Sequence, residues 1–99
     1  QPDPMRGGLT ELRKIATIAD TWGIQIAPHL FHELTVHVMA SIPNANYLEY
    51  MDWNDDLWLN PAIPRDGVLK PGEAPGHGVA FKPEVLKDHR VGGNEVKAR

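Results

Sequence analysis

Three histidines and a glutamate fall within residues 27–37, APHLFHELTVH, although the whole chain contains only five histidines. Imidazole and carboxylate groups are the usual ligands of transition metals, and they are also the usual carriers of protons in catalysis. The spacing of these residues, and the elements that position them, decide between a metal site, a catalytic site and an ordinary helix surface.

A zinc site of the metalloprotease type requires two histidines four residues apart on one helix, with a glutamate as the base. His32 and His37 are five residues apart, which separates them by about 140° around a regular helix. His29, Glu33 and His37 have the spacing of one helical stripe, but His29 follows Pro28 at the mouth of the helix. We therefore predict no metal site in this stretch, and we expect His32 and His37 to lie on a solvated or inter-element face.

The hydrophobic pattern predicts alternating helices and strands. Apolar residues between 9 and 22 recur every three or four positions and predict a helix with Thr10 as its N-cap. Residues 24–27 alternate as in a short strand, 30–42 form a second helical pattern, and 47–50 form a second short strand. This order favours parallel strands joined by crossover helices, which is an α/β fold.

The composition changes after Met51, where tryptophan, proline and glycine replace the regular period. We expect irregular chain with short hairpin strands at 67–70 and 79–81, followed by a last helix from about Pro83 to His89. Residues 92–99 are polar and lack an apolar period, which predicts a flexible tail.

Composition excludes several classes of function. The chain has 99 residues, no cysteine and a net charge of -3, so disulfides and thiolate metal sites are ruled out and a cytoplasmic location is expected. No apolar run long enough for a membrane span is present, and lysine and arginine form no basic stripe that would bind nucleic acid. A small molecule is the expected ligand. Two strands cannot close a parallel sheet, so we expect the chain to need the N-terminal remainder of the same protein.

The strand ends carry ionisable residues. His29 follows the first predicted strand, Glu49 lies at the end of the second, and Asp3 lies in the loop before the first helix. In parallel α/β folds the carboxyl ends of the strands meet at one edge, where ligands bind. We therefore expect these three side chains to face one catalytic mouth.

Five motifs, QPD, GGLTEL, HLFHE, LEYMDW and PGHGVAF, follow one another between residues 1 and 81, and the resemblance that they support extends from Gln1 to about Val91. In their order and spacing the chain resembles the C-terminal part of the mandelate racemase branch of the enolase superfamily, the mandelate racemase/muconate lactonizing enzyme family. The resemblance implies the C-terminal part of a modified TIM (β/α) barrel in residues 1–56. It also implies that residues 57–91 return to an α+β capping domain, followed by the tail at 92–99.

The chemistry implied by the resemblance is removal of the proton alpha to a carboxylate, which gives an enediolate held by Mg²⁺. Its metal ligands are expected upstream of Gln1. The resemblance assigns His29 as a general acid/base, Asp3 as the residue paired with it, and Glu49 as a contact of the substrate carboxylate. One departure is visible, because three residues separate Asp3 from Gly7, where the family commonly has four.

We expect the chain to be a segment of a Mg²⁺-dependent acid-sugar dehydratase that eliminates the beta hydroxyl, with no activity as an isolated piece. A racemase or epimerase of a 2-hydroxy acid is the alternative within the family. A non-catalytic interaction module is the alternative from another class. The expected partners are a small carboxylate substrate, the N-terminal part of the same protein and further copies of that protein.

Overall fold

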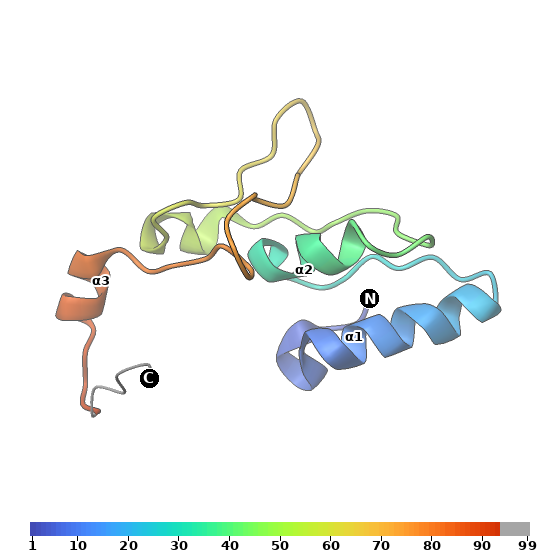
Figure 1. The fold of residues 1–99 in the computed structure, drawn as a ribbon, viewed down its shortest axis with the longest axis horizontal. Helices are drawn as coiled ribbons and strands as arrows, with labels where there is room; N and C mark the ends of the chain where they lie inside the picture. Colours follow the sequence, from blue (N-terminus) through green and yellow to red (C-terminus); the bar gives the residue numbers. More distant parts are fainter. Residues whose placement is uncertain (94–99) are drawn as a thin grey trace.

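A computed structural model of the chain describes residues 1–93, so most of the predicted tail at 92–99 lies outside the described residues. The chain order is α1 (Pro4–Thr21), α2 (His32–Met39), a 3-10 helix η1 (Asp52–Leu57) and α3 (Pro83–Asp88). In Figure 1 α1 lies toward one end of the molecule, α2 lies near the middle and α3 stands at the other end. Within residues 1–93, no helix combines the length and the apolar character that crossing a membrane requires.

Helix α1 begins earlier than the sequence pattern predicted. Asp3 is its N-cap, with the side chain accepting a hydrogen bond from the Met5 amide, and Pro4 occupies the first turn. Gly8 interrupts the helix with φ 74° and ψ 177°, a conformation open to glycine because it has no Cβ. The predicted N-cap at Thr10 is therefore wrong, although the long regular portion does lie where the apolar period placed it.

Helix α2 connects two segments that run parallel. Ile26 and Ala45 form a parallel bridge, in which the Ile26 amide donates to the Asn44 carbonyl at 2.8 Å and the Asn46 amide donates to the Ile26 carbonyl at 2.9 Å. The parallel arrangement is as expected, but each predicted strand is reduced to a single bridging residue, and residues 47–50 form no strand. An inner strand of a parallel sheet has a neighbouring strand on both edges. Among residues 1–93, by contrast, these two segments form a bridge only with each other.

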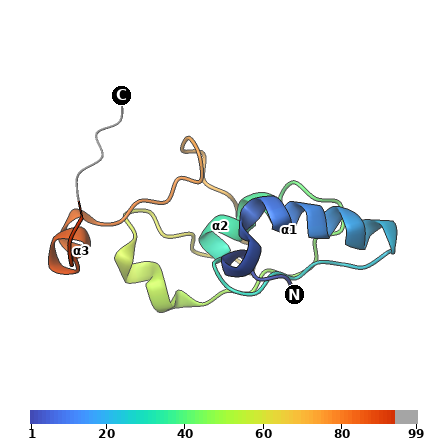
Figure 2. The ribbon, with the colours of Figure 1, turned by 90° about the horizontal axis from the view of Figure 1, so that it is seen from below.

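The core lies between α1, α2 and the two parallel segments. Helices α1 and α2 contact each other, and Figure 2 shows them side by side. Ala16, Ile26 and Met39 form its buried centre. Asn44 ties the layers together, because its buried side-chain amide donates to the carbonyls of Ala16 and Ile24, both at 2.9 Å. This packing holds the ends of the two parallel segments next to each other.

The second half of the chain is irregular, as its composition predicted. The strands expected at 67–70 and 79–81 appear as isolated antiparallel bridges, Arg65 with Val68 and Trp58 with Phe81. The tight turn between Arg65 and Val68 consists of Asp66 and Gly67, both with positive φ, which is the usual Asp-Gly solution for a two-residue hairpin. The last predicted helix is confirmed as α3.

A large part of the apolar surface of α1 is uncovered. Leu12 and Ala16 are buried, whereas Ile15, Ile18 and Trp22 are exposed, with 63% of Ile18 and 77% of Trp22 accessible. At about 100° per residue, the exposed set forms a second stripe roughly a quarter turn from the buried one.

Candidate active site

His29 and Glu49 come together at the ends of the two parallel segments. His29 Nδ1 lies 2.7 Å from Glu49 Oε2, and the same carboxylate oxygen accepts a hydrogen bond from the Leu30 amide at 2.8 Å. When Glu49 is ionised it can only accept, so a neutral His29 ring in this contact carries its proton on Nδ1 and has a free lone pair on Nε2. The pair is partly exposed, with 46% of the His29 side chain and 30% of the Glu49 side chain accessible. Nε2 is therefore suited to exchange a proton with a ligand.

A strained turn sets this geometry. Leu30 and Phe31 both have positive φ, 58° and 48°, a conformation that costs a non-glycine residue about 1–2 kcal/mol. The turn reverses the chain between the first parallel segment and α2, and it directs the Leu30 amide at Glu49. Backbone strain of this kind is found preferentially at functional sites.

Asp3 is near His29 in the backbone but is not bonded to its ring. The His29 amide donates to the Pro2 carbonyl at 3.1 Å, so residues 1–3 lie beside the first parallel segment. The Asp3 carboxylate caps α1 through the Met5 amide at 2.8 Å and lies 3.8 Å from Arg6 Nε. The carboxylate on His29 Nδ1 is that of Glu49, which corrects the expected Asp3–His29 pairing. The cause is local, because α1 begins directly after Asp3 and its free amides take the carboxylate.

His32 and His37 have different environments. His37 is half-buried, and its Nε2 lies 3.1 Å from the His77 carbonyl oxygen. His32 is 1% exposed and faces two carboxylates, with Nδ1 3.8 Å from Glu33 Oε2 and Nε2 3.8 Å from Asp55 Oδ1. Of the two environments foreseen for these histidines, His32 takes the inter-element one. Asp55 was missed from the sequence because it belongs to η1, far from His32 along the chain.

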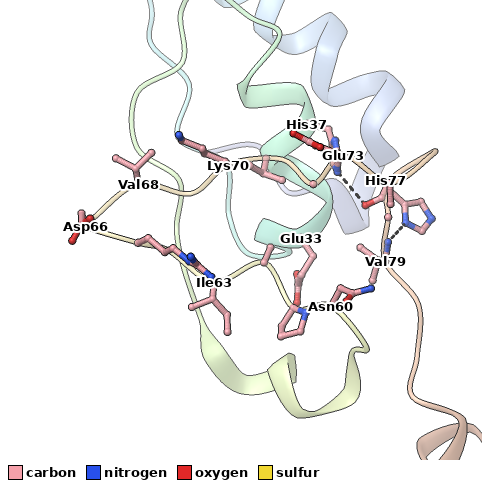
Figure 3. Close-up of a pocket in the computed structure, with 17 residues that line it drawn as sticks. Glu33, His37, Asn60, Ile63, Asp66, Val68, Lys70, Glu73, His77 and Val79 are labelled. Atoms are coloured by element: carbon pink, nitrogen blue, oxygen red, sulfur yellow. Dashed lines mark hydrogen bonds between the residues drawn. The ribbon is translucent and has the colours of Figure 1, made fainter.

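An open hollow of about 760 Å³ lies between α2 and the loop at residues 60–79. Figure 3 shows Glu33 and His37 of α2 on one side and Lys70, Glu73 and His77 of the loop around it. None of Asp3, His29 and Glu49 lines this hollow. It is therefore separate from the predicted catalytic mouth.

Within residues 1–93, one group of side chains is close enough to hold a metal ion, namely His32, Glu33 and Asp55, whose ligand atoms lie within 4.8 Å of one another. Mg²⁺ favours an octahedron of oxygen ligands that includes several waters. A buried set with an imidazole does not fit that preference. This group is therefore poorly suited to Mg²⁺.

The tryptophans of the irregular half also differ from each other. Trp58 stacks on Phe81 with ring centroids 4.4 Å apart, and its Nε1 donates to Glu33 Oε1 at 2.7 Å. Trp53 is 70% exposed. Trp58 therefore contributes to the packing between the irregular half of the chain and α2.

The chain is similar to enzymes of known activity. The family model "Enolase C-terminal domain-like" matches residues 1–85. A 3,6-anhydro-alpha-L-galactonate cycloisomerase of Streptomyces coelicolor is 34% identical over 87 residues, which cover 87% of this chain and 24% of that enzyme. A D-xylonate dehydratase of Haloferax volcanii is 33% identical, covering 96% of this chain and 26% of that enzyme.

Solved structures give the same result. An L-talarate dehydratase from Polaromonas sp. JS666, crystallised with Mg and L-glucarate, superposes with a TM-score of 0.78 at 34% identity, covering 88% of this chain and 25% of that one. The chain thus spans about a quarter of the length of the proteins it matches.

Proposed function

Because the chain belongs to the enolase C-terminal domain-like family, among enzymes of the mandelate racemase and muconate lactonizing type, we propose that it is a segment of an acid-sugar dehydratase. The observation that carries the proposal is the bond of 2.7 Å between His29 Nδ1 and Glu49 Oε2 at the ends of two adjacent parallel segments. The dehydratase activity is favoured by relatives that act on xylonate, rhamnonate and talarate or galactarate.

In the proposed architecture, residues 1–56 are the last βα units of a TIM barrel and residues 57–91 return to a capping domain. The parallel bridge between Ile26 and Ala45 supports the barrel. The exposed stripe of Ile15, Ile18 and Trp22 supports it as well, because a large apolar face is normally covered by a neighbouring element. A preceding βα unit would cover that face.

His29 is the proposed general acid/base. Its Nε2 either takes the proton from the carbon alpha to the substrate carboxylate, or gives a proton to the beta hydroxyl as the carbon–oxygen bond breaks and water leaves. Glu49 contacts His29 Nδ1 in this structure, and we propose that it also contacts the substrate carboxylate. Asp3 is proposed as a second carboxylate at the same mouth, positioned by the His29–Pro2 backbone bond.

The solved relative binds Mg and an acid sugar, and the proposed reaction needs a divalent cation to stabilise the charge that develops on the carboxylate. We propose that the residues that bind Mg²⁺ lie in the full-length protein outside this segment. The isolated segment should bind no Mg²⁺ and catalyse nothing.

The test is a screen of the full-length protein with aldonic and aldaric acids, in which the product is identified by mass and NMR. A 2-keto-3-deoxy acid, lighter than the substrate by one water, is the expected product. His29→Asn should lower kcat by about 10²–10⁴, while His89→Asn, which alters an exposed histidine of the α3 C-cap, should leave it unchanged. Full activity of His29→Asn would exclude the proposed role.

An isomerase is the second candidate, because one relative is a cycloisomerase at 34% identity. Running the reaction in D₂O separates the classes. A product of unchanged composition labelled at the alpha carbon would identify a racemase or epimerase, and an unlabelled isomer would point to a different rearrangement.

A cooperative melt of the isolated chain with sharp side-chain NMR signals would instead favour an interaction module.

A further inference from the structure

We propose that His32, Glu33 and Asp55 form a second metal site, which takes a zinc-like divalent cation and is distinct from the site for Mg²⁺. The three side chains come from α2 and η1, two elements that Figure 1 shows as neighbours in space. Their ligand atoms lie within 4.8 Å of one another. The inference does not depend on the reaction that the full-length protein catalyses.

Burial distinguishes this cluster from an ordinary group of surface charges. His32 is 1% exposed and Glu33 is 4% exposed. Two carboxylates next to one imidazole leave a net negative charge in a site sheltered from water. Such a charge is costly unless a cation compensates it. A divalent ion would supply that compensation.

Two of the inward-facing atoms have no partner of their own. His32 Nε2 and Asp55 Oδ1 are buried and make no hydrogen bond within residues 1–93. They face each other at 3.8 Å, which is too long for a hydrogen bond. It is a suitable separation for two ligands of one cation, because Zn–N and Zn–O bonds are about 2.0–2.2 Å long. Glu33 Oε2 lies beside the other ring nitrogen, 3.8 Å from His32 Nδ1, so the Glu33 carboxylate must turn toward Nε2 to reach the same ion.

The outward-facing oxygens are already held. Trp58 Nε1 donates to Glu33 Oε1 at 2.7 Å, and the Tyr50 hydroxyl donates to Asp55 Oδ2 at 2.6 Å. Each carboxylate therefore has one oxygen fixed by a neutral donor, which leaves its other oxygen directed at His32. Metal ligands are commonly oriented by such a second layer of hydrogen bonds.

The donor set selects the type of ion. One imidazole nitrogen and two carboxylate oxygens suit Zn²⁺, with a fourth position open to water. Mg²⁺ would require replacing the imidazole with oxygen ligands. An ion in this position would cross-link α2 to η1. Helix η1 begins shortly after Glu49 in the chain, and Glu49 contacts His29.

The test uses the full-length protein, from which bound metal is first removed with a chelator. The protein is then incubated with ZnCl₂ in the presence of excess MgCl₂, which fills the magnesium site, and is desalted. Elemental analysis should find about one Zn²⁺ per chain, and zinc should raise the Tm. Asp55→Asn should weaken zinc binding at least tenfold. Asp56→Asn, which alters an exposed acid of the same helix η1, should leave zinc binding unchanged.

Two further measurements keep the proposal testable where Asp55→Asn fails to fold. Tyr50→Phe removes one outer donor and should weaken zinc binding about 10–100-fold, whereas Tyr47→Phe, at a 78% exposed position, should have no effect. The proposal is overturned if the wild-type protein retains no zinc and its Tm does not respond to zinc. It is also overturned if NMR shows His32 doubly protonated after zinc treatment, because a proton would then compensate the carboxylates.

Discussion

The hydrogen bond from Trp58 to Glu33 makes a sharp prediction about stability. Trp58→Phe keeps an aromatic ring against Phe81, with which the indole stacks at 4.4 Å, but removes the N–H that donates to Glu33 Oε1 at 2.7 Å. Glu33 is 4% exposed, so water cannot readily replace the lost donor. The variant isolates one hydrogen bond to a buried carboxylate.

The magnitude follows from the charge of the acceptor and from its burial. A hydrogen bond to a charged group contributes about 1.5–3 kcal/mol, and a buried acceptor without its partner costs about 1–3 kcal/mol. These ranges describe the same loss from two sides, so they are not added. We expect Trp58→Phe to lower the free energy of unfolding by about 2 kcal/mol.

The assay is urea unfolding of the full-length protein followed by circular dichroism, in Mg²⁺ buffer without zinc, so that tryptophan fluorescence and zinc binding do not enter. Trp53→Phe is the matched control, because Trp53 is 70% exposed, and its cost should stay within about 0.5 kcal/mol. Equal stability of the Trp58→Phe and Trp53→Phe variants would refute the reasoning. A double-mutant cycle with Glu33→Gln should give a coupling of about 0.5–3 kcal/mol.

Three further predictions concern other parts of the structure. Asp3→Ala should lower the free energy of unfolding by about 1 kcal/mol through loss of the α1 N-cap, while Asp3→Asn retains the cap. If Asp3 also acts at the catalytic mouth, the Asp3→Asn variant should keep its stability but lose turnover. An unchanged kcat in that variant would exclude Asp3 from the site. The hydrogen bond to Asp55, helped by burial, raises the pKa of Tyr50 to about 12. As pH rises, the unfolded chain therefore loses the Tyr50 proton before the folded chain does. The contribution of Tyr50 to stability is complete below about pH 10 and disappears as pH rises through about 12. Ultraviolet titration should show a late tyrosinate signal that appears at high pH and is absent from Tyr50→Phe, and persistence of this signal in that variant would contradict the assignment. Leu12→Ala should cost about 2–5 kcal/mol, because Leu12 is 1% exposed. Ile18→Ala should cost a comparable amount in the full-length protein if a preceding barrel unit covers the exposed stripe, and a cost near zero in thermal unfolding would argue against that unit.

Local sequence patterns predicted much of the fold. The apolar period located α1 and α2, and the alternation of helix and strand indicated a parallel arrangement, of which the Ile26–Ala45 bridge is the trace. Element boundaries were less predictable. Helix α2 begins at His32 rather than at Leu30, because Leu30 and Phe31 adopt left-handed conformations. Neither residue type favours that conformation, so the tertiary contact with Glu49 must impose it.

The candidate site was predictable to the extent that it follows from strand ends. His29 and Glu49 were selected because each follows a strand, and the structure brings them into contact. The group formed by His32, Glu33 and Asp55 was not predictable in this way, because its members share neither a strand edge nor a helical stripe. Only the packing of η1 against α2 brings Asp55 to His32.

The position of Glu49 connects the strain of the turn to the chemistry of the site. Its Oε2 accepts both from the Leu30 amide and from the His29 ring, so one carboxylate oxygen fixes the backbone of the turn and the tautomer of the proposed base together. The two left-handed residues oppose this arrangement by about 1–2 kcal/mol each, and two hydrogen bonds to a charged acceptor offset a cost of that size. Without the carboxylate, the turn would relax and the imidazole would lose its orientation at the same time. Glu49 therefore positions the proposed base through contacts that need no bound substrate.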